Sequence, residues 1–221
     1  MNNSKLKAVV FDMDGLMIDT EPLYKYSFQK TAAGLGFDFE DSFFFRLVGR
    51  PDSSCKKMIR DYFGPKFPME VFWSQWPVVW RGMAESDGID QKNGLSELLA
   101  YLKEQNVPAA IATSSHRDQM SFSLRVSGLS HPFDAVVTGD EITQGKPAPD
   151  IYLEAAKRLG VSPSSCAALE DSENGLISAW KAGMYTIMVP DLKVPSDEVR
   201  TMAHHVADSL HEVRNILEKH L

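Results

Sequence analysis

The fold is decided close to the N-terminus, by the stretch Ala8-Val9-Val10-Phe11-Asp12-Met13-Asp14-Gly15. Its first four residues form a continuous apolar run without alternation, which is typical of a strand buried on both faces in a parallel sheet. Because the run stops at a pair of aspartates, Asp12 and Asp14 are expected at the C-terminal end of this strand. In open α/β sheets, that edge is where ligands bind.

The spacing of Asp12 and Asp14 has an electrostatic consequence. In an extended chain, side chains two positions apart point to the same side. Two negative charges about 4 Å apart repel by about 4 kcal/mol at an effective dielectric constant near 20. Such a pair requires a cation, a shared proton or a wide separation. A bound divalent metal ion is the simplest of these.

The composition describes an ordinary globular chain of 221 residues, 43% hydrophobic and 24% charged, which suits one domain or one domain with an insertion. The net charge of −7 argues against a general binder of nucleic acids or anionic membranes, because both require basic surface. Cys55 and Cys166 offer neither a disulfide framework nor a zinc-ligand spacing. With no signal-peptide pattern and no apolar segment of bilayer length, the sequence indicates a cytoplasmic protein.

From about residue 88 onward, short apolar runs alternate with helical patterns, which is the sequence form of βαβ units. The strands predicted after the first are residues 109–112, 135–137, 167–169, 186–189 and 205–207. The predicted helices are residues 95–105, 120–127, 151–159, 175–181 and 210–217. This alternation predicts a parallel sheet.

Residues 20–87 contain helical periodicity and no convincing strand, and their Gly and Pro residues divide them into about four short helices. A helical module therefore interrupts an α/β core made of residues 1–19 and 88–221. One apolar stripe in this module has helical spacing and is interpreted as part of the module's own core: Met69, Trp73, Trp76, Trp80 and Met83. Pro77 is expected to kink or break that helix.

Polar residues near the predicted strand ends form four groups: Asp12 with Asp14, Thr113, Lys146, and Glu170 with Asp171. Hard oxygen ligands without nearby His or Cys suit Mg²⁺. Phosphoryl transfer would use all four groups, because it requires a metal ion, donors to phosphate oxygens and further positive charge. Each residue alone has a structural interpretation as a turn residue, a helix cap or a solvated charge. Their joint occurrence favours a functional site.

In this order the motifs resemble those of the haloacid dehalogenase-like (HAD) hydrolase superfamily, over nearly the whole chain. The motifs are Phe11-Asp12-Met13-Asp14-Gly15, Ile111-Ala112-Thr113-Ser114-Ser115, Gly145-Lys146-Pro147-Ala148-Pro149-Asp150 and Glu170-Asp171-Ser172-Glu173-Asn174-Gly175. The resemblance implies an α/β fold: a Rossmann-like doubly wound parallel sheet with an inserted small α-helical cap domain. It also implies Mg²⁺-dependent phosphatase or phosphomutase chemistry, and is closest to the subfamily of β-phosphoglucomutases and small-molecule phosphatases.

The resemblance assigns catalytic and metal-binding roles to four carboxylates. Asp12 would be the nucleophile and a metal ligand. Asp14 would give a proton to the leaving alcohol and then activate water, while its backbone carbonyl binds the metal. Asp171 would be the remaining protein ligand, and Glu170 would act mainly through bound water.

The resemblance also implies substrate contacts. Thr113, the Ser114 amide and Lys146 would hold the transferring phosphoryl group. Mutase members carry a histidine where this chain has Tyr24, and Gly49-Arg50-Pro51 matches their arginine-bearing cap segment only approximately. Tyr24 and the approximate match around Arg50 favour a phosphatase over a mutase. Both residues are candidate substrate contacts.

The leading hypothesis is a phosphatase that acts on a small phosphorylated metabolite, such as a sugar phosphate, through a phospho-Asp12 intermediate. One alternative is a β-phosphoglucomutase-type phosphomutase. Another is a metal-independent dehalogenase, which the additional carboxylates Asp14 and Asp171 disfavour. A non-catalytic binding or regulatory member of the fold is the alternative from another class. No nucleic-acid or membrane partner is expected, and a monomer is the simpler expectation, with a dimer as the alternative. Asp19 is assigned a structural role at the hinge into the cap.

Overall fold

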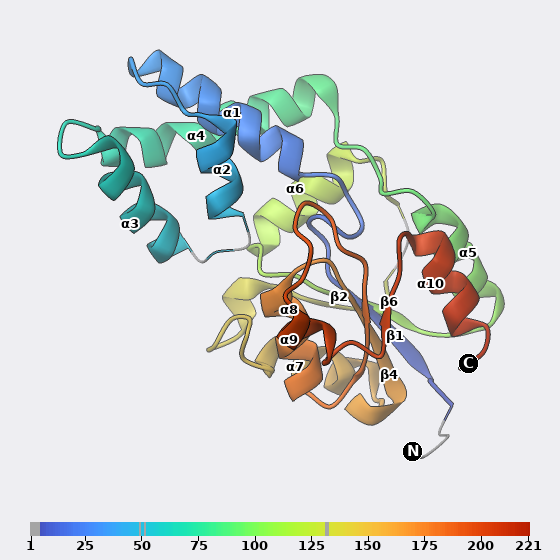
Figure 1. The fold of residues 1–221 in the computed structure, drawn as a ribbon. Coiled ribbons are helices and arrows are strands. Elements are labelled where there is room, and N and C mark those ends of the chain that lie inside the picture. Colours follow the sequence, from blue (N-terminus) through green and yellow to red (C-terminus); the bar gives the residue numbers. More distant parts are fainter. Residues whose placement is uncertain (1–4, 49, 51, 131–132) are drawn as a thin grey trace. The chain divides into compact units, whose positions relative to one another are not determined.

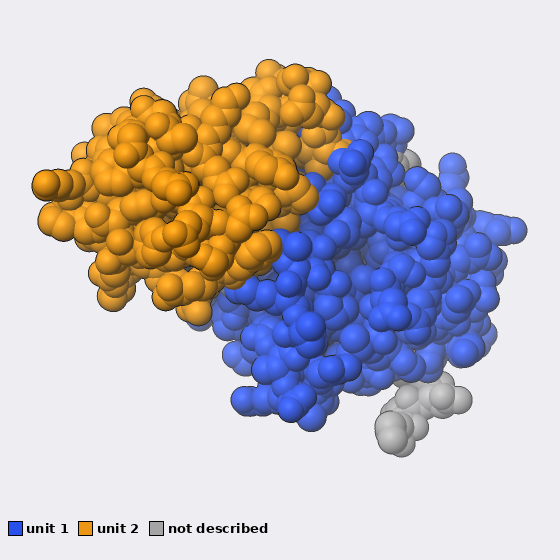
Figure 2. Space-filling view, turned by 45° about the horizontal axis from the view of Figure 1, so that its top comes forward, with its two compact units in different colours: residues 1–19, 90–221 blue, residues 20–89 orange. Residues whose placement is uncertain are grey.

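The computed structural model describes residues 5–48, 50, 52–130 and 133–221. The chain divides into two units, which Figure 2 colours separately. We call residues 1–19 and 90–221 the core unit, and residues 20–89 the helical unit.

The core unit contains one parallel sheet, whose six described strands follow the order β3-β2-β1-β4-β5-β6 (Figure 1). The strands are β1 (Ala8–Phe11), β2 (Ala109–Ala112), β3 (Ala135–Val137), β4 (Cys166–Glu170), β5 (Tyr185–Met188) and β6 (His205–Val206). Phe11 of β1 pairs with Ile111 of β2 on one side and with Leu169 of β4 on the other. The predicted bounds of β1, β2 and β3 are confirmed, and those of the other three strands differ by one residue at one or both ends.

Helices cover both faces of this sheet, which explains the unbroken apolar runs of its strands. On one face, Ala8 and Val10 of β1 pack with Ile151 of α7 and Ala179 of α8. On the other side of the strands, α5 and α10 pack against each other (Figure 1). The helices of the core unit are α5 (Leu95–Glu104), α6 (Arg117–Val126), α7 (Asp150–Leu159), α8 (Glu173–Lys181), α9 (Asp197–Arg200) and α10 (Leu210–Leu217), with 3₁₀ turns η1 (Gly139–Glu141) and η2 (Pro163–Ser165).

Three helix starts differ from the predictions: α7 begins one residue early, and α6 and α8 begin three and two residues early for local reasons. Helix α8 begins two residues before the predicted start, because the Ser172 hydroxyl accepts a hydrogen bond from the Gly175 amide (3.1 Å) and caps the helix. Helix α6 begins at Arg117, whose amide donates to Asp140 Oδ1 (3.1 Å). Polar contacts at the helix ends, which apolar periodicity does not report, therefore set these boundaries.

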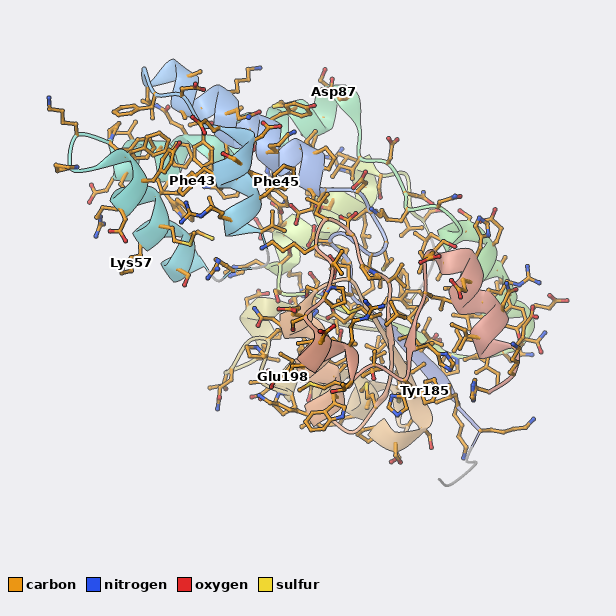
Figure 3. The ribbon with its side chains drawn as sticks, in the orientation of Figure 1. Phe43, Phe45, Lys57, Asp87, Tyr185 and Glu198 are labelled. Carbon is orange, nitrogen blue, oxygen red and sulfur yellow. The ribbon has the colours of Figure 1, made fainter. Side chains whose placement is uncertain are left out.

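The helical unit is built from α1 (Glu21–Gly34), α2 (Asp41–Leu47), α3 (Asp52–Phe63) and α4 (Met69–Asp87). Its core is aromatic: Phe28, Phe39, Phe43 and Phe72 are buried in one cluster. Phe43, labelled in Figure 3, stacks on Tyr62 of α3 with ring centroids 3.9 Å apart. Trp73 and Trp76 pack against this cluster, and Trp80 is 1% exposed. The interpretation of the stripe as core is confirmed for Met69, Trp73, Trp76 and Trp80, while Met83 is half-buried.

Of the two effects expected of Pro77, the break does not occur, and the kink stays a prediction. Helix α4 runs unbroken through Pro77 from Met69 to Asp87. A proline inside a helix removes one hydrogen bond and costs about 3 kcal/mol. Burial of large aromatic side chains stabilises by about 1.5–3 kcal/mol each, so the aromatic face of α4 offsets the local cost.

The predicted fold class, a doubly wound α/β sheet with an inserted helical module, is confirmed. Within the described residues, no helix combines the length and the apolar character needed to cross a lipid bilayer.

Candidate active site

The polar positions predicted from the sequence lie at the C-terminal edge of the sheet. Asp12 directly follows β1, Thr113 directly follows β2, and Glu170 is the last residue of β4. Lys146 reaches this edge from the segment before α7. Strand β1 lies between β2 and β4, and the strand order reverses there. The edge is therefore the topological switch point at which open α/β sheets bind ligands.

The Lys146 ammonium joins the ends of three neighbouring strands. It donates to Asp12 Oδ1 after β1, to the Ala112 carbonyl of β2 (3.0 Å) and to Glu170 Oε1 of β4 (2.6 Å). Its side chain is 6% exposed, and a buried ammonium requires such acceptors. Burial alone would lower the pKa of Lys146, but the charges of Asp12 and Glu170 outweigh it and hold the pKa above its usual range. Lys146 is a fixed positive charge.

Three carboxylates form the acidic part of the site. Asp12, Glu170 and Asp171 each offer an oxygen within 4.8 Å of the other two. Burial raises the pKa of Asp12 to about 8; Lys146 works against this shift and Glu170 adds to it. Burial, followed by the charges of Asp12 and Glu170, also raises the pKa of Asp171. The site carries more negative charge than Lys146 alone balances.

This donor set fits a hard divalent cation. Oxygen ligands are those that Mg²⁺ prefers, and a bound cation would keep the buried carboxylates ionised. The backbone beside them is also shaped for close approach: Gly15 has φ of +84°, and a Cβ there would collide with Asp171 Oδ2. The described residues therefore support a divalent metal site at Asp12, Glu170 and Asp171.

Two hydroxyl groups contact Asp14. Ser115 Oγ donates to Asp14 Oδ2 (2.8 Å), and Thr113 Oγ1 lies 3.5 Å from the same oxygen. The Ser115 amide in turn donates to Thr113 Oγ1 (3.1 Å), which holds the two hydroxyl-bearing residues together. The segment after β2 thus orients the carboxylate that follows β1.

The loop that carries Asp14 is anchored by Lys92. Its ammonium donates to Asp191 (2.7 Å) and to Asp19 (3.4 Å), and its amide donates to the Met17 carbonyl (2.9 Å). The Asp19 amide also donates to the Asp90 carbonyl (2.8 Å). These contacts support the structural role predicted for Asp19.

The remaining predicted substrate contacts, Ser114, Tyr24 and Arg50, lie in two different units of the chain. Ser114 follows Thr113 at the same edge and is exposed. Tyr24 and Arg50 belong to the helical unit, where Tyr24 stacks on Trp80 (5.3 Å between centroids) and Arg50 Nε donates to the Arg46 carbonyl (2.8 Å). Gly49 and Pro51, which flank Arg50 in the predicted cap segment, lie outside the described residues. Contact of Tyr24 or Arg50 with substrate stays a prediction.

Three residues without a role predicted from the sequence lie beside these groups in the structure. Ser115 contacts Asp14, while Tyr152 and Ser172 both donate to Glu170. Ser115 could have been found from its position in the quoted motif. Tyr152 carries no such signal, because it lies on the buried, largely apolar face of α7 and reads as core.

The family described as haloacid dehalogenase-like hydrolase matches residues 9–189, a range that includes all four motifs. The phosphorylated carbohydrates phosphatase of Thermotoga maritima is 31% identical over 182 residues, which are 82% of this chain and 84% of that protein. Hexitol phosphatase B of Escherichia coli K12 is 32% identical over 219 residues, 95% of each chain.

A solved structure gives the same relationship in three dimensions. A mutant of CbbY from Rhodobacter sphaeroides, crystallised in complex with xylulose-(1,5)bisphosphate, superposes with a TM-score of 0.76. The two chains are 27% identical, and the match covers 94% of this chain and 96% of CbbY. The resemblance predicted from the motifs is confirmed.

Proposed function

Because the chain belongs to the haloacid dehalogenase-like hydrolase family, we propose that it hydrolyses a small phosphorylated metabolite, in the class of sugar phosphates, through a phosphoaspartate at Asp12. One observation carries this proposal: Lys146 joins Asp12 to Glu170 at the switch point of the sheet, with Asp171 beside them. A carboxylate nucleophile, a fixed positive charge and a cation site are the parts that phosphoryl transfer requires.

The first step transfers the phosphoryl group to the protein. A carboxylate oxygen of Asp12 attacks phosphorus, and the bond from phosphorus to the substrate oxygen breaks. The leaving oxygen takes a proton from the Asp14 carboxyl group, which Ser115 and Thr113 orient. The products of this step are an alcohol, phospho-Asp12 and an ionised Asp14.

The second step returns the enzyme to its starting state. Water attacks the phosphorus of phospho-Asp12 and gives a proton to Asp14, and the bond from phosphorus to the Asp12 oxygen breaks. Inorganic phosphate leaves, Asp12 is again a carboxylate, and Asp14 is again protonated. Through both steps Lys146 stabilises the negative charge of the transferring group.

The metal expected here is Mg²⁺, which Asp12, Asp171 and the Asp14 carbonyl would hold, with Glu170 acting through water; when bound, it would neutralise phosphate charge. Thr113 and the Ser114 amide are proposed to hold phosphate oxygens. The relatives support the substrate class: two are phosphatases of phosphorylated carbohydrates or hexitols by name, and CbbY was crystallised with a sugar bisphosphate.

The phosphomutase alternative shares the first step and differs in the acceptor of the phosphoryl group. Hydrolysis is favoured because Tyr24 stands where the mutase members that this chain resembles carry a histidine. A ³²P-labelled sugar phosphate separates the two reactions: hydrolysis yields labelled inorganic phosphate, whereas a mutase returns the label to sugar.

The direct test is phosphate release from hexitol phosphates, pentose and hexose phosphates, ketose bisphosphates and phosphoglycolate in the presence of Mg²⁺. Asp12→Asn removes the nucleophile and should lower release to below about one thousandth of wild type. Asp208→Asn, an exposed aspartate outside the site, is the matched control and should keep full activity. Wild-type activity in Asp12→Asn, or no release from any substrate by the wild type, would contradict the proposal.

A further inference from the structure

Tyr152 is a buried polar residue on an apolar helix face. Helix α7 packs Ile151, Ala155 and Ala156 against the sheet, and Tyr152 among them is fully buried. A buried tyrosine normally finds a partner for its hydroxyl group. Here the hydroxyl donates to Glu170 Oε1, at the edge of the sheet that carries the candidate active site.

The Glu170 carboxylate is held from several sides. Lys146 Nζ donates to the same oxygen as Tyr152 (2.6 Å), and Ser172 Oγ donates to the other oxygen (3.2 Å). Gly175 closes a further side, because a Cβ at that position would collide with the carboxylate. Glu170 therefore has one orientation, and donors on separate elements determine it.

Tyr152 also contacts Lys146 directly. The Lys146 ammonium lies over the Tyr152 ring, 5.2 Å from its centroid. The ring thus limits where the lysine head can move, while the hydroxyl fixes the carboxylate to which that head is bound. Both contacts act on the group that bridges Glu170 and Asp12.

We propose that Tyr152 is a positioning residue that acts through Glu170 to hold the Lys146 ammonium against Asp12. This inference rests on the proposed phosphatase function. Without the hydroxyl, Glu170 Oε1 keeps only Lys146 as a side-chain donor, and the carboxylate is held less firmly. The ammonium would then be less well placed for the charge that develops on the transferring phosphoryl group, while binding of the substrate's distal part would not change.

Tyr152→Phe tests the proposal, because it removes the hydroxyl and retains the ring. We expect kcat to fall at least about tenfold, because the ammonium that stabilises the transferring group is less well placed. KM should change less than about twofold, as expected for an interaction made mainly in the transition state. Orthovanadate, a transition-state analogue measured with Mg²⁺ present, should bind about tenfold more weakly.

Tyr185→Phe is the matched control. Tyr185, labelled in Figure 3, begins β5, so it lies at the opposite end of the parallel strands from the site. Its hydroxyl lies 3.1 Å from His220 Nε2. Loss of that hydroxyl should leave kcat and vanadate affinity unchanged.

A double-mutant cycle with Glu170→Ala distinguishes positioning from a general structural effect. If Tyr152 acts through Glu170, Tyr152→Phe should lower kcat in the wild-type background and have little further effect in Glu170→Ala. An equal loss in both backgrounds would overturn the inference. Equal vanadate affinity of wild type and Tyr152→Phe would also overturn it, even where Glu170→Ala does not fold. Absence of phosphate release by the wild type contradicts the proposed function instead, and the vanadate comparison still decides the role of Tyr152.

Discussion

At two glycines, the lack of a Cβ atom lets the backbone approach the carboxylates of the candidate active site closely. Gly175 lies in the first turn of α8, against the buried carboxylate of Glu170, and Gly15 lies against Asp171. Neither position leaves space for a Cβ. At Gly15 the positive φ adds a second requirement for glycine. Two residues that carry no reactive group thus set the shape of the site.

Gly175→Ala should therefore be costly. The added methyl group forces Glu170 or α8 to move, and overpacking of this kind lowers the free energy of unfolding by about 1–3 kcal/mol. Phosphatase activity should fall as well, because Glu170 holds Lys146. Urea unfolding and phosphate release measure the two effects.

Gly82→Ala is the matched control, because Gly82 is an exposed residue of α4 with no atom near the position of a Cβ. Alanine is favoured over glycine inside a helix by about 1 kcal/mol, so this variant should be more stable than wild type. A Gly175→Ala variant as stable and active as wild type would contradict the packing described for Glu170.

At the scale of elements, the edge strand β6 and its neighbour β5 are linked by a side chain that titrates. His204 directly precedes β6, and its Nδ1 accepts a hydrogen bond from the Thr186 amide of β5 (3.1 Å). Burial, followed by the charges of His205 and His220, lowers the pKa of His204 from its ordinary value of 6.5. The folded protein therefore favours the neutral ring, which can accept this hydrogen bond.

The sign of the pH dependence follows from that shift. A group whose pKa is lower in the folded state contributes stability that is fully present above pH 6.5 and is lost as the pH falls through the folded pKa. His204→Asn retains an acceptor that does not titrate. Thermal unfolding from pH 8 to pH 5 should thus show a larger loss of stability below about pH 6.5 for wild type than for His204→Asn. Parallel curves for the two proteins would contradict the assignment.

At the scale of the whole molecule, the chain passes twice between the core unit and the helical unit, at residues 19–20 and 89–90. Lys92 lies close to both crossings on the core-unit side. It follows Asp90 by two residues, and its ammonium bridges Asp19 and Asp191. Among the described residues, Asp191 Oδ2 is buried and accepts no hydrogen bond, so Lys92 is the cation on which this carboxylate depends. One lysine thus anchors both connections.

Lys92→Met should lower the free energy of unfolding by about 1–3 kcal/mol, because it leaves a largely buried carboxylate without its donor. Lys57→Met is the matched control: Lys57 forms an exposed ion pair with Asp61 in α3, and its loss should change stability by less than about 0.5 kcal/mol. Urea unfolding of both variants gives the comparison. Equal effects would show that Lys92 is an ordinary surface charge.

Local signals predicted most of the elements because each signal lies within one element. The apolar run of residues 8–11 is a strand in the structure with the predicted bounds. The α4 stripe is core, as its helical spacing indicated. Pro77 shows the limit of such signals, because its local preference is outweighed by the packing of aromatic side chains from other helices.

Some residues of the candidate site could likewise be predicted from local signals, and others could not. Placement of Asp12, Thr113 and Glu170 at one edge was predictable, because the carboxyl ends of neighbouring parallel strands share that edge. The contact of Tyr152 with Glu170 was not, because a tyrosine on a buried helix face reads as core until the opposite strand is placed beside it.

The sequence by itself determined the parallel sheet, the helical module and the acidic, hydroxyl and lysine groups at the strand ends, because period, run length and motif order are properties of neighbouring residues. Only the tertiary structure decided which groups Lys146 bridges and which residues hold them. Lys146 lies 134 residues from Asp12 along the chain, and Lys92 lies 99 residues from Asp191. Contacts at such separations depend on how complete elements pack, and no local pattern encodes that packing.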